Sequence, residues 1–255
     1  MNILRDTWTM AKRSLRHTVR SMDTIITVVA TPIAMMLMFV YVFGSSFQQS
    51  IGSEKYINFI APTIIVMTVV SGIAYAAVRL SMDLQKGIIN RFKTMPVAPS
   101  SILGGHAVSS TLSNLFSSLL VLLVALLIGF RSGAGIAEWL LFGGLLALFT
   151  LATTWLALLF GLFAKTMEGA GAFSYILLFL IFISSGFTPV DTMHPALRWF
   201  AEHQPMTPII ETMRSLLTHG VAGNSAVAAI AWCIGLLIVS YVLALRVYKT
   251  KTIRA

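Results

Sequence analysis

Long blocks of apolar residues, separated by short polar connections, dominate the chain. These blocks are apolar on every face, unlike the one-sided pattern of a surface helix. A helix needs about 20 apolar residues to cross the ~30 Å hydrocarbon core of a bilayer. We therefore predict an all-α integral membrane protein with six transmembrane helices, at about residues 25–43, 57–78, 106–130, 137–164, 170–187 and 226–247. Pro32 is expected to break the first span in mid-course, and Pro62 lies within the second.

Residues 1–22 show a different pattern and are predicted to form an N-terminal amphipathic helix at the membrane surface. Apolar residues recur three or four positions apart, and basic residues occupy the other positions. A basic amphipathic helix of this kind lies in the headgroup region, with Trp8 as its anchor. A solvated N-terminal helix is the alternative. The remainder, 23–255, is predicted to be a single transmembrane domain.

The connection between the second and third spans contains a second amphipathic pattern. Leu84, Ile88 and Phe92 recur at four-residue spacing among polar residues. Pro96 disfavours helical geometry at Met95, so the short helix is expected to cover 83–95. It is too short to span the membrane, and it either anchors the loop at the surface or docks a partner.

The connection between the fifth and sixth spans predicts two short re-entrant helices within 190–220. Pro195 opens the first helix, which is expected to reach about Glu202. Thr207 followed by Pro208 is a start signal for the second helix, with Thr207 as its N-cap. Gly220 stands where a helix-ending glycine belongs.

Charge distribution sets the expected orientation. Only 11% of the residues are charged and the formal net charge is +9. The basic residues gather at the ends of the apolar blocks, which argues against nucleic-acid binding and for a membrane orientation signal. With both termini in the cytoplasm, fourteen of the eighteen basic residues lie inside and four, Lys55, Arg131, Arg198 and Arg214, lie outside. The positive-inside rule therefore predicts cytoplasmic termini.

Several kinds of chemistry lack their sequence signals. The chain contains no G-x-x-x-x-G-K-[ST], so we do not expect it to bind ATP as a P-loop protein. There is no H-E-x-x-H or C-x-x-C motif, the five histidines are scattered, and Cys233 is the single cysteine. The predicted spans hold almost no ionisable residues, whereas ion-coupled transport usually requires them. The sequence therefore predicts no catalytic residue and no metal site.

Two stretches resemble ABC transporter type-2 permeases. The first is MDLQKGIINRFKTMPVAPSSILGGH, after the second span, and the second is SSGFTPVDTMHPALRWFAEHQPMTPIIETMRSLLTHG, after the fifth. Together with the spans, the resemblance covers nearly the whole chain and is strongest to drug-resistance permeases of the daunorubicin-exporter type. Gln204-Pro205 departs from the Asn-Pro that this family usually has, and the amide is longer by one methylene.

The resemblance implies a homodimer in a bacterial-type cytoplasmic membrane, joined to two copies of a separate ABC ATPase that binds ATP and Mg. This chain would carry no cofactor of its own and would contact membrane lipid and a lipophilic small molecule. The resemblance also implies three sets of site residues. ATPase coupling would involve Asp83, Gln85, Lys86, Gly87, Arg91, Phe92 and Pro96. The substrate path would involve Thr63, Met67, Thr68, Tyr75, Tyr175, Phe179 and Phe182. An external re-entrant gate would involve Gly186, Pro189, Pro205, Glu211 and Arg214.

The function implied is ATP-driven export of hydrophobic or amphiphilic compounds, such as drug or antibiotic efflux. Export of a lipid-linked polysaccharide is an alternative within the family, ranked second because the spans are poor in Trp and polar groups. A membrane scaffold without transport is the alternative outside it. An intramembrane enzyme is disfavoured because no paired carboxylates, Ser/Lys pair or histidine cluster lies at membrane depth.

Overall fold

The computed structural model describes residues 22–46, 55–86 and 99–254, and it is helical nearly throughout them. Strands are absent from these residues, so the all-α prediction is confirmed over this part of the chain. The predicted N-terminal helix, apart from Met22, lies outside the described residues, as does most of the predicted segment 83–95.

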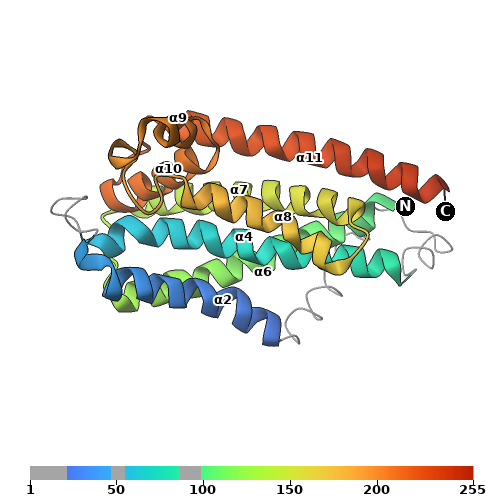
Figure 1. Ribbon diagram of the computed structural model, residues 1–255, viewed down its shortest axis with the longest axis horizontal. Helices are drawn as coiled ribbons and strands as arrows, with labels where there is room; N and C mark the ends of the chain where they lie inside the picture. Colours follow the sequence, from blue (N-terminus) through green and yellow to red (C-terminus); the bar gives the residue numbers. More distant parts are fainter. Residues whose placement is uncertain (1–21, 47–54, 87–98, 255) are drawn as a thin grey trace.

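Among the described residues, the long helices lie side by side, and short helices gather at one end of the bundle (Figure 1). The elements are α2 (Met22–Leu37), the π-helix η1 (Met38–Val42), α4 (Tyr56–Gln85), α6 (Pro99–Ile128), α7 (Ile136–Phe163), α8 (Met167–Phe182), the 3-10 turn η2 (Val190–Thr192), α9 (Pro195–His203), α10 (Met206–His219) and α11 (Ala226–Arg254). The short helices α9 and α10 mark one end, and the last turn of α11 marks the opposite end (Figure 1).

Four of these helices are long and apolar enough to cross a membrane. They are α4, α6 from Ser101, α7 and α11 to Thr250. Two further apolar helices, Val28–Val42 and Met167–Phe182, are shorter than the length expected for a full crossing. The chain is therefore a multi-pass membrane protein.

Helix α4 forms the centre of the bundle, and α11 lies at its periphery. In the most apolar 18-residue stretch of α4, 83% of the residues are buried, against 17% in that of α11. The two stretches have similar mean hydropathy, 2.0 and 2.4, so sequence alone does not distinguish them. Helix α4 packs against α2, α6, α7 and α8, whereas α11 packs mainly on α7.

Several hydroxyl groups within the bundle bond to the backbone of their own helix. Thr68 donates to the carbonyl of Ile64 at 2.7 Å, and Thr150 donates to that of Leu146 at 2.7 Å. Ser240 donates to Leu236 in the same way. Such bonds, to the carbonyl one turn earlier, allow Ser and Thr to lie in an apolar helix without an unpaired donor.

Several features of the long helices differ from the sequence prediction. Helix α6 begins at Pro99, seven residues before the predicted 106, because proline suits the first turn and the polar residues from His106 to Ser118 are largely buried. The predicted break at Pro32 is not observed, because a proline removes one helical hydrogen bond and leaves its neighbours intact, and α2 continues through it. The irregular part of this span is the π-helix η1, which follows α2.

The predicted N-cap at Thr207 is wrong. The structure places the N-cap of α10 at Pro205, and Thr207 lies within the first turn. The helix-ending role of Gly220 is confirmed by its left-handed backbone, with φ of 65°. Pro195 is confirmed in the first turn of α9.

Close packing of α7 on α4 depends on a glycine. A Cβ added to Gly161 would lie 2.7 Å from the carbonyl oxygen of Ala77, so any side chain there would push the two backbones apart. Gly143, on the same helix, has open space around the corresponding position. The two glycines therefore differ in the room available while sharing the same helical backbone.

We expect Gly161→Ala to destabilise the protein by about 1–3 kcal/mol, the usual effect of overpacking. Gly143→Ala is the matched control and should be neutral or slightly stabilising, because alanine favours the helix. Thermal unfolding of the two purified variants in detergent measures the difference. Equal unfolding temperatures would contradict the close contact between α7 and α4.

Candidate functional site

Helix α8 ends before the predicted end of its span. Its last helical residue is Phe182, whereas the span is predicted to reach residue 187, and Ser184, Ser185 and Gly186 lie in the non-helical part. The last carbonyls of a helix have no amide partners within it and need other donors. Here the carbonyls of Leu180, Ser185, Gly186 and Phe187 all receive side-chain donors from other parts of the chain.

Arg214 of α10 makes the largest contribution. Its Nε donates to the carbonyl of Phe59 at 2.9 Å. One terminal nitrogen donates to the carbonyls of Ser185 at 2.9 Å and Gly186 at 3.2 Å. The guanidinium also lies 3.6 Å from the centroid of the Phe59 ring. One side chain therefore joins α10, α4 and the segment after α8 by charge-assisted hydrogen bonds and a cation–π contact.

Helix α4 supplies two more donors. The Thr63 hydroxyl donates to the carbonyl of Gly186 at 2.9 Å, and the Tyr56 hydroxyl donates to that of Phe187 at 3.3 Å. A Cβ on Gly186 would lie 2.6 Å from Cγ2 of Thr63, so glycine is required for this approach. The close packing of Gly186 on Thr63 thus fixes where the segment after α8 crosses α4.

The start of α10 completes the arrangement. Gln204 donates from Nε2 to the carbonyl of Leu180 at 2.8 Å, and the Ser185 amide donates to the Thr207 hydroxyl at 3.4 Å. We call the side chains that bind residues 180–187 the α8 clamp; they are those of Tyr56, Thr63, Gln204, Thr207 and Arg214. The longer amide of Gln204 thus reaches α8.

The clamp contains some of the residues predicted for an external gate. Gly186 and Arg214 meet in it directly. Pro189 and Pro205 lie just outside, as the N-caps of η2 and α10, and Glu211 is half-buried on α10 without being one of the clamp donors. Sequence reasoning missed Tyr56 and Gln204 as donors, because nothing in helical spacing shows which distant carbonyl a side chain reaches.

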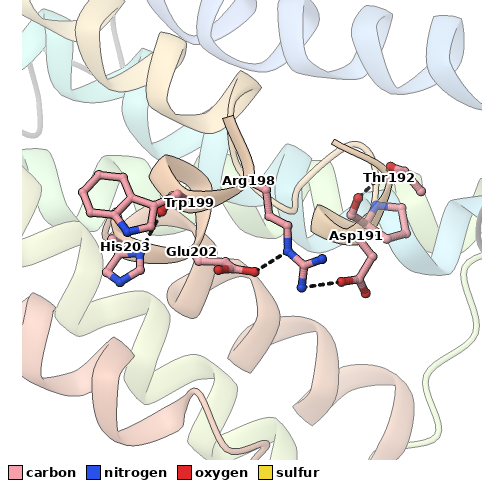
Figure 2. A network of polar contacts seen from close by, with 7 residues as sticks. Asp191, Thr192, Arg198, Trp199, Glu202 and His203 are labelled. Atoms are coloured by element: carbon pink, nitrogen blue, oxygen red, sulfur yellow. Dashed lines mark hydrogen bonds and ion pairs between the residues drawn. The ribbon is translucent and has the colours of Figure 1, made fainter. Parts of the chain in front are cut away.

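A second polar network lies on α9, at the same end of the bundle (Figure 2). Arg198 binds Glu202 at 2.7 Å and Asp191 at 2.8 Å, which ties α9 to η2. The hydrogen bond with Glu202, and then the charge of Asp191, raise the pKa of Arg198 above its usual value. These groups are exposed to solvent, so the network orients α9 and adds little to stability.

The predicted path residues separate into two groups. Thr63, Met67 and Thr68 of α4 are buried among neighbouring helices, and Tyr75 is partly exposed. On α8, by contrast, Tyr175, Phe179 and Phe182 have exposed fractions of 72%, 61% and 45%. The rings on α8 recur at three- to four-residue spacing and form an aromatic row on its outer face.

The coupling residues are only partly described. Asp83, Gln85 and Lys86 lie at the last turn of α4 and just after it, at the end opposite the clamp. Gly87, Arg91, Phe92 and Pro96 lie outside the described residues. Gln85 donates from Nε2 to the carbonyl of Lys165 at 3.3 Å, which links α4 to the connection between α7 and α8. Over the described residues, no three His, Cys, Asp or Glu side chains gather as metal ligands would.

We expect Arg214→Gln to destabilise the protein by about 2–4 kcal/mol, because several carbonyls in an apolar setting lose a charged donor together. Arg198→Gln is the matched control, an exposed arginine of the neighbouring helix, and should leave the unfolding temperature nearly unchanged. Thermal unfolding in detergent compares the two. If both variants unfold at the wild-type temperature, Arg214 does not hold the clamp.

Comparison with known proteins agrees with this architecture. The family model described as "ABC-2 type transporter" matches residues 5–218. The daunorubicin resistance ABC transporter permease protein DrrB1 of Streptomyces coeruleorubidus is 30% identical over 232 residues, covering 89% of this chain and 80% of that protein. The probable doxorubicin resistance ABC transporter permease protein DrrC of Mycobacterium tuberculosis is 21% identical over 227 residues, covering 89% and 82%. The chain therefore belongs to the ABC-2 type transporter family.

Proposed function

We propose that the chain is the membrane permease subunit of an ATP-driven exporter of hydrophobic or amphiphilic compounds. The observation that carries this proposal is the exposed aromatic row of α8, which ends at the clamp. Aromatic rings offer flat apolar surfaces on which a planar lipophilic molecule stacks. The relatives named for daunorubicin and doxorubicin resistance support a substrate of this class.

Six membrane crossings follow if α2 with η1 and α8 also span the bilayer. The 16 residues of α8 rise only about 24 Å, less than the hydrocarbon thickness. Residues 183–187 would complete the crossing without helical hydrogen bonds. Non-helical backbone at membrane depth is tolerated where it is buried in protein, and the α8 clamp provides that burial.

The orientation places the clamp outside and the end of α4 inside. Arg79 and Lys86 lie towards the inner end of α4, and Arg246 and Lys249 lie on the last turns of α11, on the same side of the bundle. The positive-inside rule assigns that side to the cytoplasm. The clamp then lies near the outer surface, where we propose that it forms the external gate with Gly186, Pro189, Pro205, Glu211 and Arg214.

The substrate path is proposed to run along α8. Tyr175, Phe179 and Phe182 present their rings away from the protomer core. In a homodimer, the same face of a second copy would close the other side of the path. Thr63, Met67 and Thr68 are buried in the described conformation and would contribute when α4 and α8 separate.

ATP hydrolysis is assigned to a separate cytoplasmic ATPase that binds ATP and Mg, two copies per homodimer. Support comes from the family to which the chain belongs and from the absence of a P-loop in its sequence. The segment 83–95 would dock that ATPase. The proposed contacts are Gln85, Gly87, Arg91 and Phe92, and Asp83, Lys86 and Pro96 are assigned to coupling with them. Asp83 and Gln85 lie in the last turn of α4, which a movement of the docked segment would displace.

Transport is the direct test. The chain and its ATPase, reconstituted in vesicles, should accumulate doxorubicin in an ATP-dependent manner and hydrolyse ATP faster when the drug is present. Phe179→Ala should reduce the stimulation of ATP hydrolysis by the drug about tenfold. Each ring that stacks on the drug contributes about 1 kcal/mol or more to its binding free energy. Phe116→Ala, an exposed ring on α6, is the matched control and should behave as wild type.

Two outcomes would count against the proposal. Absence of ATP-dependent doxorubicin uptake by the wild type would exclude drug export. Stimulation of ATP hydrolysis by a lipid-linked glycan instead would favour polysaccharide export. Equal effects of Phe179→Ala and Phe116→Ala would place the path elsewhere.

Docking of the ATPase is tested by a pull-down from detergent-solubilised membranes. The wild type should recover a P-loop ATPase, and Arg91→Glu should lose it, because reversing the charge in the docking segment opposes a complementary surface on the partner. Lys249→Glu, an exposed basic residue on α11, is the matched control and should retain the ATPase. Recovery of the ATPase by Arg91→Glu at the wild-type level would exclude Arg91 as a contact, and no ATPase in any sample would favour the scaffold.

A further inference from the structure

A close contact between a histidine and a carboxylate joins α4 to α6 near the segment that connects them. Nε2 of His106 lies 3.2 Å from the nearer carboxylate oxygen of Asp83. Both side chains are largely shielded, with exposed fractions of 11% for His106 and 31% for Asp83. Helix α4 ends at Gln85 and α6 begins at Pro99, so the pair closes the base of the intervening segment.

The same two helices also meet deeper in the bundle. A Cβ on Gly72 would lie 1.7 Å from Oδ1 of Asn114, so the Asn114 side chain packs directly on the glycine. Gly72 precedes Asp83 by eleven residues, about 16 Å along the helix, and Asn114 follows His106 by eight, about 12 Å. The helices are antiparallel and are therefore held at two separate levels.

The end of α4 also holds a third element. Gln85 bonds to Ser81 within α4 at 3.2 Å and to the carbonyl of Lys165 at 3.3 Å. Lys165 directly precedes Thr166, whose hydroxyl caps α8 by accepting from the Gly169 amide at 3.1 Å. A displacement of the last turn of α4 would therefore act on α6 through His106 and on the start of α8 through Gln85.

We propose that His106 is a positioning residue for the coupling of ATP hydrolysis to transport. It holds α6 to the last turn of α4, so that movement of the docking segment shifts both helices together. Nε2 of the imidazole and the Asp83 carboxylate are within hydrogen-bonding reach, and in this shielded setting such an interaction is stronger than it would be in water. The proposal rests on the proposed function, since it requires an ATPase that moves the segment.

A merely structural role predicts a different result. If the pair only stabilises the fold, its loss lowers the unfolding temperature and the amount of protein, while each folded molecule transports normally. If it positions α6 for coupling, its loss reduces drug transported per ATP hydrolysed, and binding of the ATPase is retained. The ratio of transport to hydrolysis separates the two roles, because it does not depend on the amount of folded protein.

The experiment compares His106→Gln with His106→Leu in the reconstituted complex. Glutamine places an amide donor at a reach similar to that of Nε2, and leucine fills similar space without a donor. We expect His106→Leu to lower the transport-to-hydrolysis ratio about tenfold, equivalent to about 1.4 kcal/mol, and His106→Gln to retain most of it. Ser109→Ala is the matched control, because the buried Ser109 hydroxyl donates to the His106 carbonyl on the same helix, and its removal should leave the ratio unchanged.

Asp83→Ala completes a double-mutant cycle and carries the test if His106→Leu fails to fold, because alanine removes the acceptor that asparagine would keep. Asp83→Ala should lower the ratio as His106→Leu does, and the double variant should be no worse than either alone. A wild-type ratio in His106→Leu or Asp83→Ala, or an equal loss in His106→Gln and His106→Leu, overturns the positioning role alone. Absence of transport by the wild type overturns the proposed function and this role with it.

Discussion

Backbone carbonyls in an apolar environment must find hydrogen-bond donors, and the end of α8 is where this constraint shapes the structure. The helix stops at Phe182, and the carbonyls around the break receive donors from α4 and from the segment that returns through α10. Arg214 provides the charged donor that several of them share. The short helices α9 and α10 are therefore part of how α8 ends, and the bundle is closed at this end by the same contacts.

Helix α4 connects the two ends of the molecule. Its first two turns hold the clamp through Tyr56 and Thr63, and its last turn holds α6 and the α7–α8 connection through Asp83 and Gln85. Between them the helix is packed on nearly all sides, and close-packed interiors transmit displacement with little compression. A rigid central helix with polar contacts at both ends is suited to linking a cytoplasmic docking event with an external gate.

The sequence pattern predicted the apolar helices and the two short helices, because the period and length of an apolar pattern depend on whether a segment faces lipid, protein or water. Pro195 predicted the start of α9 and Gly220 the end of α10, because the backbone preferences of these residues are local. It gave Thr207 the wrong role, since a hydroxyl near a helix start can cap its own helix or bind another segment, and here it accepts from Ser185. In the sequence His106 is one of five scattered histidines, and its link to Asp83 depends on how two helices align in space.

The predicted path residues also show that sequence does not reveal how helices align in space, and here the difference affects the mechanism. The family resemblance grouped Met67 and Thr68 with Phe179, yet the first two are buried within the protomer and the third is exposed. A buried row on α4 and an exposed row on α8 cannot line one passage while the two helices are packed together. The clamp joins these helices through Thr63 and Gly186, so opening a passage between them requires breaking the contact that also satisfies the end of α8. In the proposed function, gating and the stability of the α8 break would therefore depend on the same hydrogen bonds.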